Sequence, residues 1–282
     1  AAAVSVGTSH RQDGTPCQDA FHVAELPLPL GSPALMAFVA DGAGSVSASE
    51  IGARMAVDAA AGFARRHAEV IGATFDAAFV QALVVHVREV LVAEATSRGI
   101  GVRELACTIL GALAFRDETL LFQIGDGAIV FDSGAGLVLA ITPMGGEYVN
   151  MTHFLVDDRA LERTAIRAVG AVTRLALFSD GIQRLALNLS SGVPHAPFFA
   201  PFFATLESAP ADQRAALDAA LQRFLDSDQV NTRTDDDKTL DPLSAKDLHG
   251  SQATFGFPKL FAPRGAQKGA AVADDAADRL GV

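Results

Sequence analysis

The chain of 282 residues has no Trp, one Tyr and two Cys, and its 22 Lys and Arg are outnumbered by 33 Asp and Glu. The formal charge of −11 argues against a nucleic-acid binder, which needs cationic side chains to displace counterions from phosphates. The same charge disfavours an anionic membrane surface. We therefore expect neither a nucleic acid nor a membrane as partner.

Cysteine is too scarce for a disulfide framework or a zinc site. Cys17 and Cys107 lie far apart and form no Cys-X-X-Cys pair, which favours a reducing compartment. The first residues, AAAVSVGTSHRQDG, lack the basic start and long apolar run of a signal peptide. We expect a cytoplasmic protein.

A long membrane-spanning run is also missing. The longest stretch without a charged side chain covers residues 185–206, and Pro194, Pro197 and Pro201 make it a poor lipid-facing helix. Half of the residues are nonetheless hydrophobic, enough to bury a continuous core and to exclude disorder over most of the chain.

The order of apolar patterns predicts the fold class α+β, with antiparallel sheets covered by helices. Strand patterns come first, two adjacent helices follow, many strands return, and a last helix closes the series. Ser47 and Glu50 form a possible capping box for the first helix, and Gly99 ends the second. The expected strands cover residues 4–9, 20–26, 34–40, 105–141, 152–156 and 163–180, and the expected helices cover 47–70, 75–99, 182–187 and 211–225. Composition changes after residue 240, so we expect a domain over 1–240 and an appended tail over 241–282.

One pattern occurs three times: an apolar strand that ends in Asp-Gly, at Asp41, Asp126 and Asp180. A carboxylate at the end of a buried strand is held rigidly, and the following glycine lets a ligand approach the backbone. Asp19 and the acidic run 235–237 add further carboxylates. Oxygen ligands without a Cys or His cluster favour Mg²⁺ or Mn²⁺.

Each of these signals has a simpler interpretation. Asp126-Gly127 lies between two strand-like runs and is also typical of a type I′ hairpin turn. Asp41 and Asp180 precede helical sequence and could be helix caps, and the run 235–237 alone is typical of a solvated loop. P-loop, nucleophile-elbow and dinucleotide-binding motifs are missing from the sequence.

Six motifs in order carry a family resemblance: CQDA, AFVADGAGS, ELACTILGALA, LFQIGDGAIV, LALFSDGI and DDDKTL. Over about residues 4–240 the chain resembles the metal-dependent type 2C protein Ser/Thr phosphatases, and is most similar to a bacterial branch with a GTSH…CQDA opening. The resemblance implies a central antiparallel β-sandwich flanked by helix pairs, in layer order α-β-β-α. It also implies a phosphoprotein phosphatase that hydrolyses phosphate monoesters by direct attack of a metal-bridging water.

The resemblance assigns roles to the acidic residues. Two Mn²⁺ or Mg²⁺ ions are expected, with a third at Asp126. Asp41 would bridge the two ions, and the carbonyl of Gly42 would bind the second. Asp180 and Asp236 would complete the shell of the first, and Asp19 would hold a metal-bound water. Thr108, in a family strand motif, is expected to be structural.

The sequence also departs from the family pattern. The family's phosphate-clamping Arg lies at a shorter interval before the first acidic pair, which leaves His10 and Arg11 as catalytic candidates. Arg11 could pair two phosphate oxygens, whereas His10 fits the bacterial branch. Asp241-Pro242 is expected to interrupt the last strand.

Three family side chains are replaced: a Glu by Gln18, a His acid by Ala43 and a second acid by Arg184. These replacements leave an alternative open, a catalytically weak phosphatase-like module that binds a phosphoprotein or another protein partner. A phosphatase acting on small phosphate esters would share the same metal chemistry. Physiological substrate and oligomeric state do not follow from the sequence.

Overall fold

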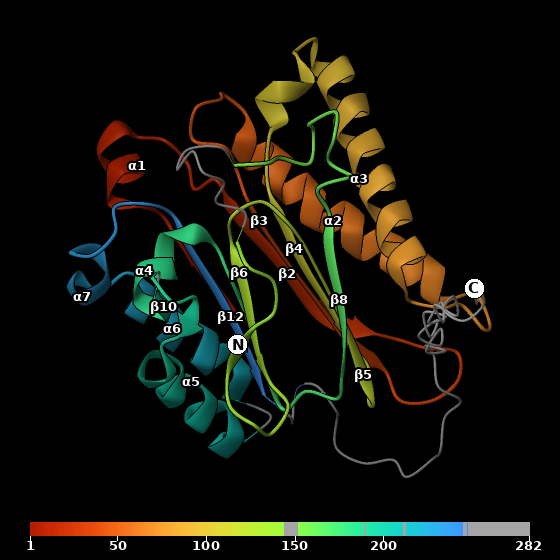
Figure 1. Ribbon diagram of the computed structural model, residues 1–282. Coiled ribbons are helices and arrows are strands. Elements are labelled where there is room, and N and C mark those ends of the chain that lie inside the picture. The colour runs from red at the N-terminus through yellow and green to blue at the C-terminus, as the bar shows by residue number, and fades with distance from the viewer. Residues whose placement is uncertain (144–151, 189, 211–212, 245–246, 248–282) are drawn as a thin grey trace, which may run out of the picture.

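The computed structural model describes residues 1–143, 152–188, 190–210, 213–244 and 247. Two antiparallel sheets are stacked face to face, and helices cover both outer faces (Figure 1). This arrangement confirms the expected β-sandwich flanked by helix pairs. No helix in the described part of the chain is long and apolar enough to cross a membrane.

The first sheet has the strand order β2-β3-β4-β5-β8. Its strands are β2 (Asp19–Leu26), β3 (Ala34–Asp41), β4 (Ile109–Ala114), β5 (Glu118–Ile124) and β8 (Ala165–Gly170). The second sheet has the order β1-β12-β9-β6-β7. It consists of β1 (Ala3–Ser5), β12 (Lys238–Ser244), β9 (Arg174–Phe178), β6 (Ala128–Asp132) and β7 (Val138–Leu139). A separate pair joins β10 (Leu187–Asn188) to β11 (Val193–Pro194).

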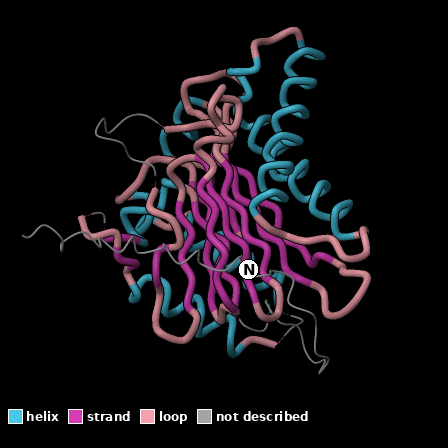
Figure 2. Tube along the Cα trace, turned by 45° about the vertical axis from the view of Figure 1, so that its right-hand side comes forward, coloured by secondary structure: helices cyan, strands magenta, loops and turns pink. Residues whose placement is uncertain are grey.

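Helices α2 (Ser49–Ala68) and α3 (Ala77–Arg98) cover the first sheet, as Figures 1 and 2 show. The carboxylate of Asp76 caps α3 by accepting from two backbone N–H groups, and Gly99 ends the helix in a left-handed conformation, as expected. The other face carries α5 (Ala196–Ser208) and α6 (Arg214–Leu225). Shorter helices are α1 (Thr8–Asp13), η1 (Val102–Leu105), η2 (Asp180–Ile182), α4 (Gln183–Ala186) and α7 (Asp228–Asn231).

The core between the sheets consists of alternate side chains of both sheets, such as Leu110, Ile129 and Leu177. Each fully buried side chain of this size contributes about 1.5–3 kcal/mol to folding. The stacked sheets therefore form a rigid base for the loops at their ends.

Several local expectations were wrong. The strand expected over residues 4–9 ends at Ser5, and helix α1 follows it. Residues 152–156 form no strand. Ser47 does not cap α2, because its N–H and hydroxyl both donate to the carboxylate of Glu104.

The Pro-rich stretch within residues 185–206, for which no helix was expected beyond residue 187, contains helix α5, with Pro201 inside it. Phe199, Phe203 and Leu206 recur at helical spacing and are buried against the second sheet. Burial of these side chains outweighs the local cost of Pro201.

The interruption expected at Asp241-Pro242 is also wrong, since β12 pairs with β9 from Leu240 to Ser244. The carbonyl of Pro242 accepts a hydrogen bond from the nitrogen of Ala1, on the side away from β9. The N and O of a strand residue face the same side, so the missing N–H of proline removes no bond to β9. Residues 241–244 of the tail expected over 241–282 belong to β12. Of the rest, all but residue 247 falls outside the described residues, and an appended tail there stays a prediction.

Candidate active site

The acidic residues singled out in the sequence lie at one end of the sandwich. β2 begins at Asp19, β3 ends at Asp41, and β9 leads directly into Asp180. Asp126 lies between the end of β5 and the start of β6. Because neighbouring strands are antiparallel, these starts and ends meet at the same edge.

The backbone of Asp41 is held in place by Thr108. Its backbone N–H donates to the hydroxyl of Thr108 at 3.0 Å, and its carbonyl accepts from the N–H of Thr108 at 2.8 Å. The next position is occupied by glycine because the chain passes very close to helix α2. A Cβ on Gly42 would lie 2.8 Å from the Cβ of Ser49. Thr108 is thus structural in a specific way, since it anchors the backbone that carries the Asp41 carboxylate.

Asp126 is not part of a hairpin, because β5 and β6 belong to different sheets. The side-chain amide of Gln123 donates to the carbonyls of Gly125 and Gly127 at 3.0 and 2.8 Å, and holds the crossover in place. Gln183 donates to the Asp126 carbonyl. Thr152 donates to a carboxylate oxygen of Asp126 at 2.5 Å. The type I′ turn interpretation is therefore wrong.

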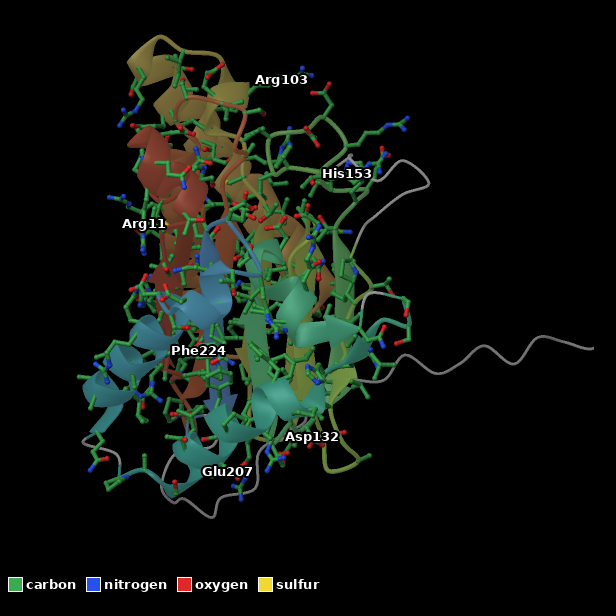
Figure 3. All side chains as sticks on the ribbon, turned by 90° about the vertical axis from the view of Figure 1, so that its left-hand side faces the viewer. Arg11, Arg103, Asp132, His153, Glu207 and Phe224 are labelled. Atoms are coloured by element: carbon green, nitrogen blue, oxygen red, sulfur yellow. The ribbon has the colours of Figure 1, made fainter. Side chains whose placement is uncertain are left out.

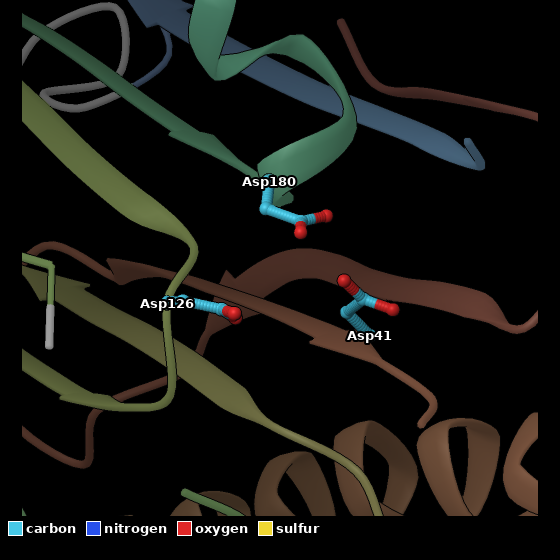
Figure 4. A group of neighbouring side chains, drawn as sticks. All are labelled: Asp41, Asp126 and Asp180. Atoms are coloured by element: carbon cyan, nitrogen blue, oxygen red, sulfur yellow. The ribbon is translucent and has the colours of Figure 1, made fainter. Parts of the chain in front are cut away.

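The carboxylates of Asp41, Asp126 and Asp180 point into one space (Figure 4). One oxygen from each lies within 4.8 Å of the others, a spacing at which a shared cation can replace mutual repulsion by attraction.

This space belongs to an open acidic cavity of about 150 Å³. A water molecule takes up about 30 Å³ in the liquid, so the cavity has room for several waters or ions. The lining residues are Gln18, Asp41, Gly42, Ala43, Gly44, Thr108, Asp126, Thr152, Phe154, Asp180, Asp236 and Asp237.

The pKa values of the cavity carboxyls reflect their crowding. Burial raises the pKa of Asp41 well above its usual value, and the charges of Asp19, Asp180 and Asp236 raise it further. Burial and the charges of Asp126 and Asp236 raise the pKa of Asp180 to about 6. Together these shifts show a site that is electrostatically unfavourable without a compensating cation.

Asp19 lies opposite Asp41 in the pair of β2 and β3 and is almost fully buried. Burial raises its pKa to about 7, against the opposing effect of two hydroxyl donors. The hydroxyls of Ser179 and Thr239 donate to Oδ2 at 2.7 and 2.8 Å. Oδ1 is buried and has no partner among the described residues.

The segment 235–237 is not a plain solvated loop. Asp236 lines the cavity but does not belong to the close trio of carboxylates. Lys238 is fully buried, and its ammonium donates to the Asp236 carbonyl at 3.1 Å. Asp237 is 2% exposed and accepts hydrogen bonds from the backbone N–H groups of Gly7 and Gln18, each at 2.6 Å.

The two cationic candidates differ in their surroundings. Nδ1 of His10 lies 3.0 Å from Oδ2 of Asp237, which lines the cavity. Arg11 lies on the flank of the molecule (Figure 3). Its guanidinium pairs with Asp226, and neither of these two residues lines the cavity. Of the three replaced positions, Gln18 and Ala43 line the cavity, whereas Arg184 is exposed.

The sequence did not indicate Ser179 or Thr239 as residues of the site, and it did not distinguish the role of Asp237 from that of Asp236. Ser179 precedes an Asp-Gly pair and Thr239 follows the acidic run, but no local pattern indicates that both hydroxyls meet Asp19. Their contact depends on the pairing of β12 with β9.

The donor set fits divalent cations. It consists of carboxylates and one close backbone segment at Gly42, which is the chemistry that Mg²⁺ and Mn²⁺ prefer. Oδ1 of Asp19 and Oε1 of Gln18 are buried acceptors without a donor among the described residues, and each could accept from a water held by a cation.

Comparisons with known proteins agree with this geometry. Residues 6–226 match the family model described as "Protein phosphatase 2C". The chain is 45% identical over 239 residues to serine/threonine-protein phosphatase 3 of Escherichia coli, covering 84% of this chain and 94% of the relative.

Solved structures share the fold at low identity. The serine/threonine phosphatase Stp1 from Staphylococcus aureus superposes with a TM-score of 0.55 at 15% identity, covering 87% of this chain and 93% of that one. The catalytic domain of the serine/threonine protein phosphatase PstP, solved in complex with two manganese ions, gives a TM-score of 0.50 at 14% identity. That match covers 79% of this chain and 95% of that one.

Proposed function

Because the chain belongs to the protein phosphatase 2C family and is a serine/threonine protein phosphatase, we propose that its acidic cavity is a two-ion Mn²⁺ or Mg²⁺ centre. The observation that carries this proposal is the convergence of Asp41, Asp126 and Asp180 within 4.8 Å. Asp41, the Gly42 carbonyl, Asp180 and Asp236 would hold the two ions, and Asp126 would contribute to a third.

The bound ions would supply Lewis acidity, activating water as a nucleophile and neutralising phosphoryl oxygens. The protein's own residues provide orientation. Oδ2 of Asp19 is occupied by Ser179 and Thr239, and its Oδ1, which has no partner among the described residues, would accept a hydrogen bond from a water of the metal centre. Thr108 and Gln123 hold the backbones that carry Asp41 and Asp126.

The substrate is a phosphoprotein, and we propose that His10, rather than Arg11, contacts its phosphoryl group. Nδ1 of His10 is within hydrogen-bond distance of Asp237, which lines the cavity, whereas Arg11 is already paired with Asp226. A cytoplasmic location and the lack of nucleic-acid or membrane partners stay predictions from the sequence.

The proposal is tested by phosphate release from a phosphothreonine peptide, titrated with Mn²⁺ and Mg²⁺ and then quenched with EDTA. We expect turnover that rises with metal and is abolished by chelation. Asp180→Asn should reduce kcat by about 10²–10³-fold, the loss typical of removing one electrostatic group that acts in the transition state.

Full activity of Asp180→Asn, or turnover that EDTA does not affect, would contradict the metal centre. Peptide binding without turnover at millimolar Mn²⁺ would favour the catalytically weak binding module. Asp228→Asn, an exposed change on α7 away from the cavity lining, is the matched control and should leave kcat unchanged.

A further inference from the structure

The carboxylate of Asp237 contacts three separate residues outside its own loop. Its Oδ1 accepts from the N–H of Gly7, and its Oδ2 accepts from the N–H of Gln18 and lies 3.0 Å from Nδ1 of His10. One nearly buried carboxylate thus joins the start of α1, the residue before Asp19 and the ring of His10.

This arrangement defines the state of the His10 ring. An aspartate carboxylate only accepts hydrogen bonds, so Nδ1 must be the donor. Nε2 has no hydrogen-bond partner in the part of the chain that the structure describes. The ring is 17% exposed, so it is held on one side and open to a ligand on the other.

The first turn of α1 is fixed to the same loop. The N–H and hydroxyl of Ser9 donate to the Asp235 carbonyl at 3.1 and 2.7 Å. A Cβ on Gly7 would lie 2.4 Å from that carbonyl oxygen, so helix and loop are in direct backbone contact. His10 therefore has little freedom to move independently of the cavity wall.

We propose that Asp237 is a positioning residue that orients His10 so that Nε2 contacts the phosphoryl group in the acidic cavity. This inference rests on the proposed function, and it explains how a histidine on a six-residue helix can take the place of a phosphate-binding arginine. Carboxylate–histidine pairs of this kind fix the tautomer and direction of the ring.

The test measures two affinities by calorimetry on the intact protein, that of Mn²⁺ and that of inorganic phosphate for the Mn²⁺-loaded protein. His10→Asn keeps a donor near the Nδ1 position for Asp237 but lacks Nε2. Asp237→Asn cannot accept all three hydrogen bonds. We expect both variants, and His10→Ala, to weaken phosphate binding about tenfold with unchanged Mn²⁺ affinity.

The double variant His10→Ala/Asp237→Asn should bind phosphate no more weakly than His10→Ala alone, because the two residues act as one unit. With a phosphothreonine peptide, His10→Asn should raise KM with little change in kcat. The matched control is Asp58→Asn, since Asp58 pairs with Nδ1 of His22 at 3.1 Å on the outer surface. This variant should leave both affinities unchanged.

The inference is overturned if His10→Asn binds phosphate as tightly as the parent, if the losses in the double variant multiply, or if Asp237→Asn weakens Mn²⁺ binding as much as phosphate binding. Failure of the proposed function gives a different result. In that case the protein would show this pattern of phosphate affinities but no metal-dependent turnover.

Discussion

Asp19 and Asp41 lie directly opposite each other in the antiparallel pair of β2 and β3. Directly opposed like charges destabilise a pair of strands, yet this pair is continued along eight residues of each strand. The structure thus holds two carboxylates together at an energetic cost that a bound cation would remove.

Metal binding should accordingly stabilise the fold. Excess Mn²⁺ is expected to raise the melting temperature, since ligand at a hundred times its Kd adds about 2.7 kcal/mol to the free energy of unfolding. Asp41→Asn should be more stable than the parent without metal and should lose most of the Mn²⁺-induced shift. Calorimetric melting with EDTA and with Mn²⁺ measures both, and an unchanged melting temperature with Mn²⁺ would contradict the prediction.

Ser179→Ala removes the hydroxyl that donates to Asp19 and accepts from the N–H of Thr239 at 3.0 Å. We expect kcat to fall about 10–100-fold, as for other residues that orient a metal site, and stability to fall by about 1–3 kcal/mol. Peptide turnover and denaturant melts measure the two effects. Ser208→Ala is the control, because in the described part of the chain its exposed hydroxyl bonds only to carbonyls of α5. An equal effect in both variants would count against a role for Ser179.

Asp241 is fully buried, and neither carboxyl oxygen has a partner among the described residues. Burial raises its pKa from 3.8 to about 7. The folded state therefore binds more protons than the unfolded state between these values, so this group lowers stability as pH rises through this window. Asp241→Asn should resemble the parent near pH 4 and exceed it by at least about 1 kcal/mol at pH 8.

Metal-free denaturant melts across this pH range test the Asp241 prediction. The difference between variant and parent isolates Asp241 from the cavity carboxyls, which are present in both proteins. A difference that does not change with pH would show that the carboxyl does not titrate in this window.

Gly42→Ala places a methyl group 2.8 Å from Ser49. We expect a loss of about 1–3 kcal/mol, typical of overpacking, together with weaker Mn²⁺ binding because the backbone beside Asp41 must move. Gly62→Ala, within α2, meets only the guanidinium of Arg66 at 3.3 Å among the described residues and should stabilise the protein by about 0.5–1 kcal/mol. Thermal melts and Mn²⁺ titrations of both variants would contradict this account if the two changes had the same sign.

Much of the fold follows from local patterns. Period-two and helical apolar spacing predict the layers, and the repeated Asp-Gly ends predict the acidic edge, because strand ends are set by residues close in sequence. Helix α5 could not be predicted in this way, since the propensity cost of Pro201 is offset only by the sheet that Phe199 and Phe203 cover. The crossover at Asp126 has the same local sequence as a hairpin, and only the pairing of β6 with β9 separates the two.

The contacts around Asp19 and His10 are the least predictable from sequence. Ser179 and Thr239 meet Asp19 from far along the chain, and Asp237 reaches His10 across most of its length. Such contacts depend on the order of strands in the second sheet, which no local signal encodes.

The place of β12 between β1 and β9 has a consequence for synthesis. The strand that completes the second sheet, which carries Thr239 and directly follows Asp237, leaves the ribosome only after the other described strands of both sheets. Contacts this distant in sequence form slowly. A nascent chain stopped before Asp237 would carry Asp41, Asp126 and Asp180 without Thr239, which donates to Asp19, and without Asp237, which contacts His10. We therefore expect phosphatase activity to begin only when the last strand is in place.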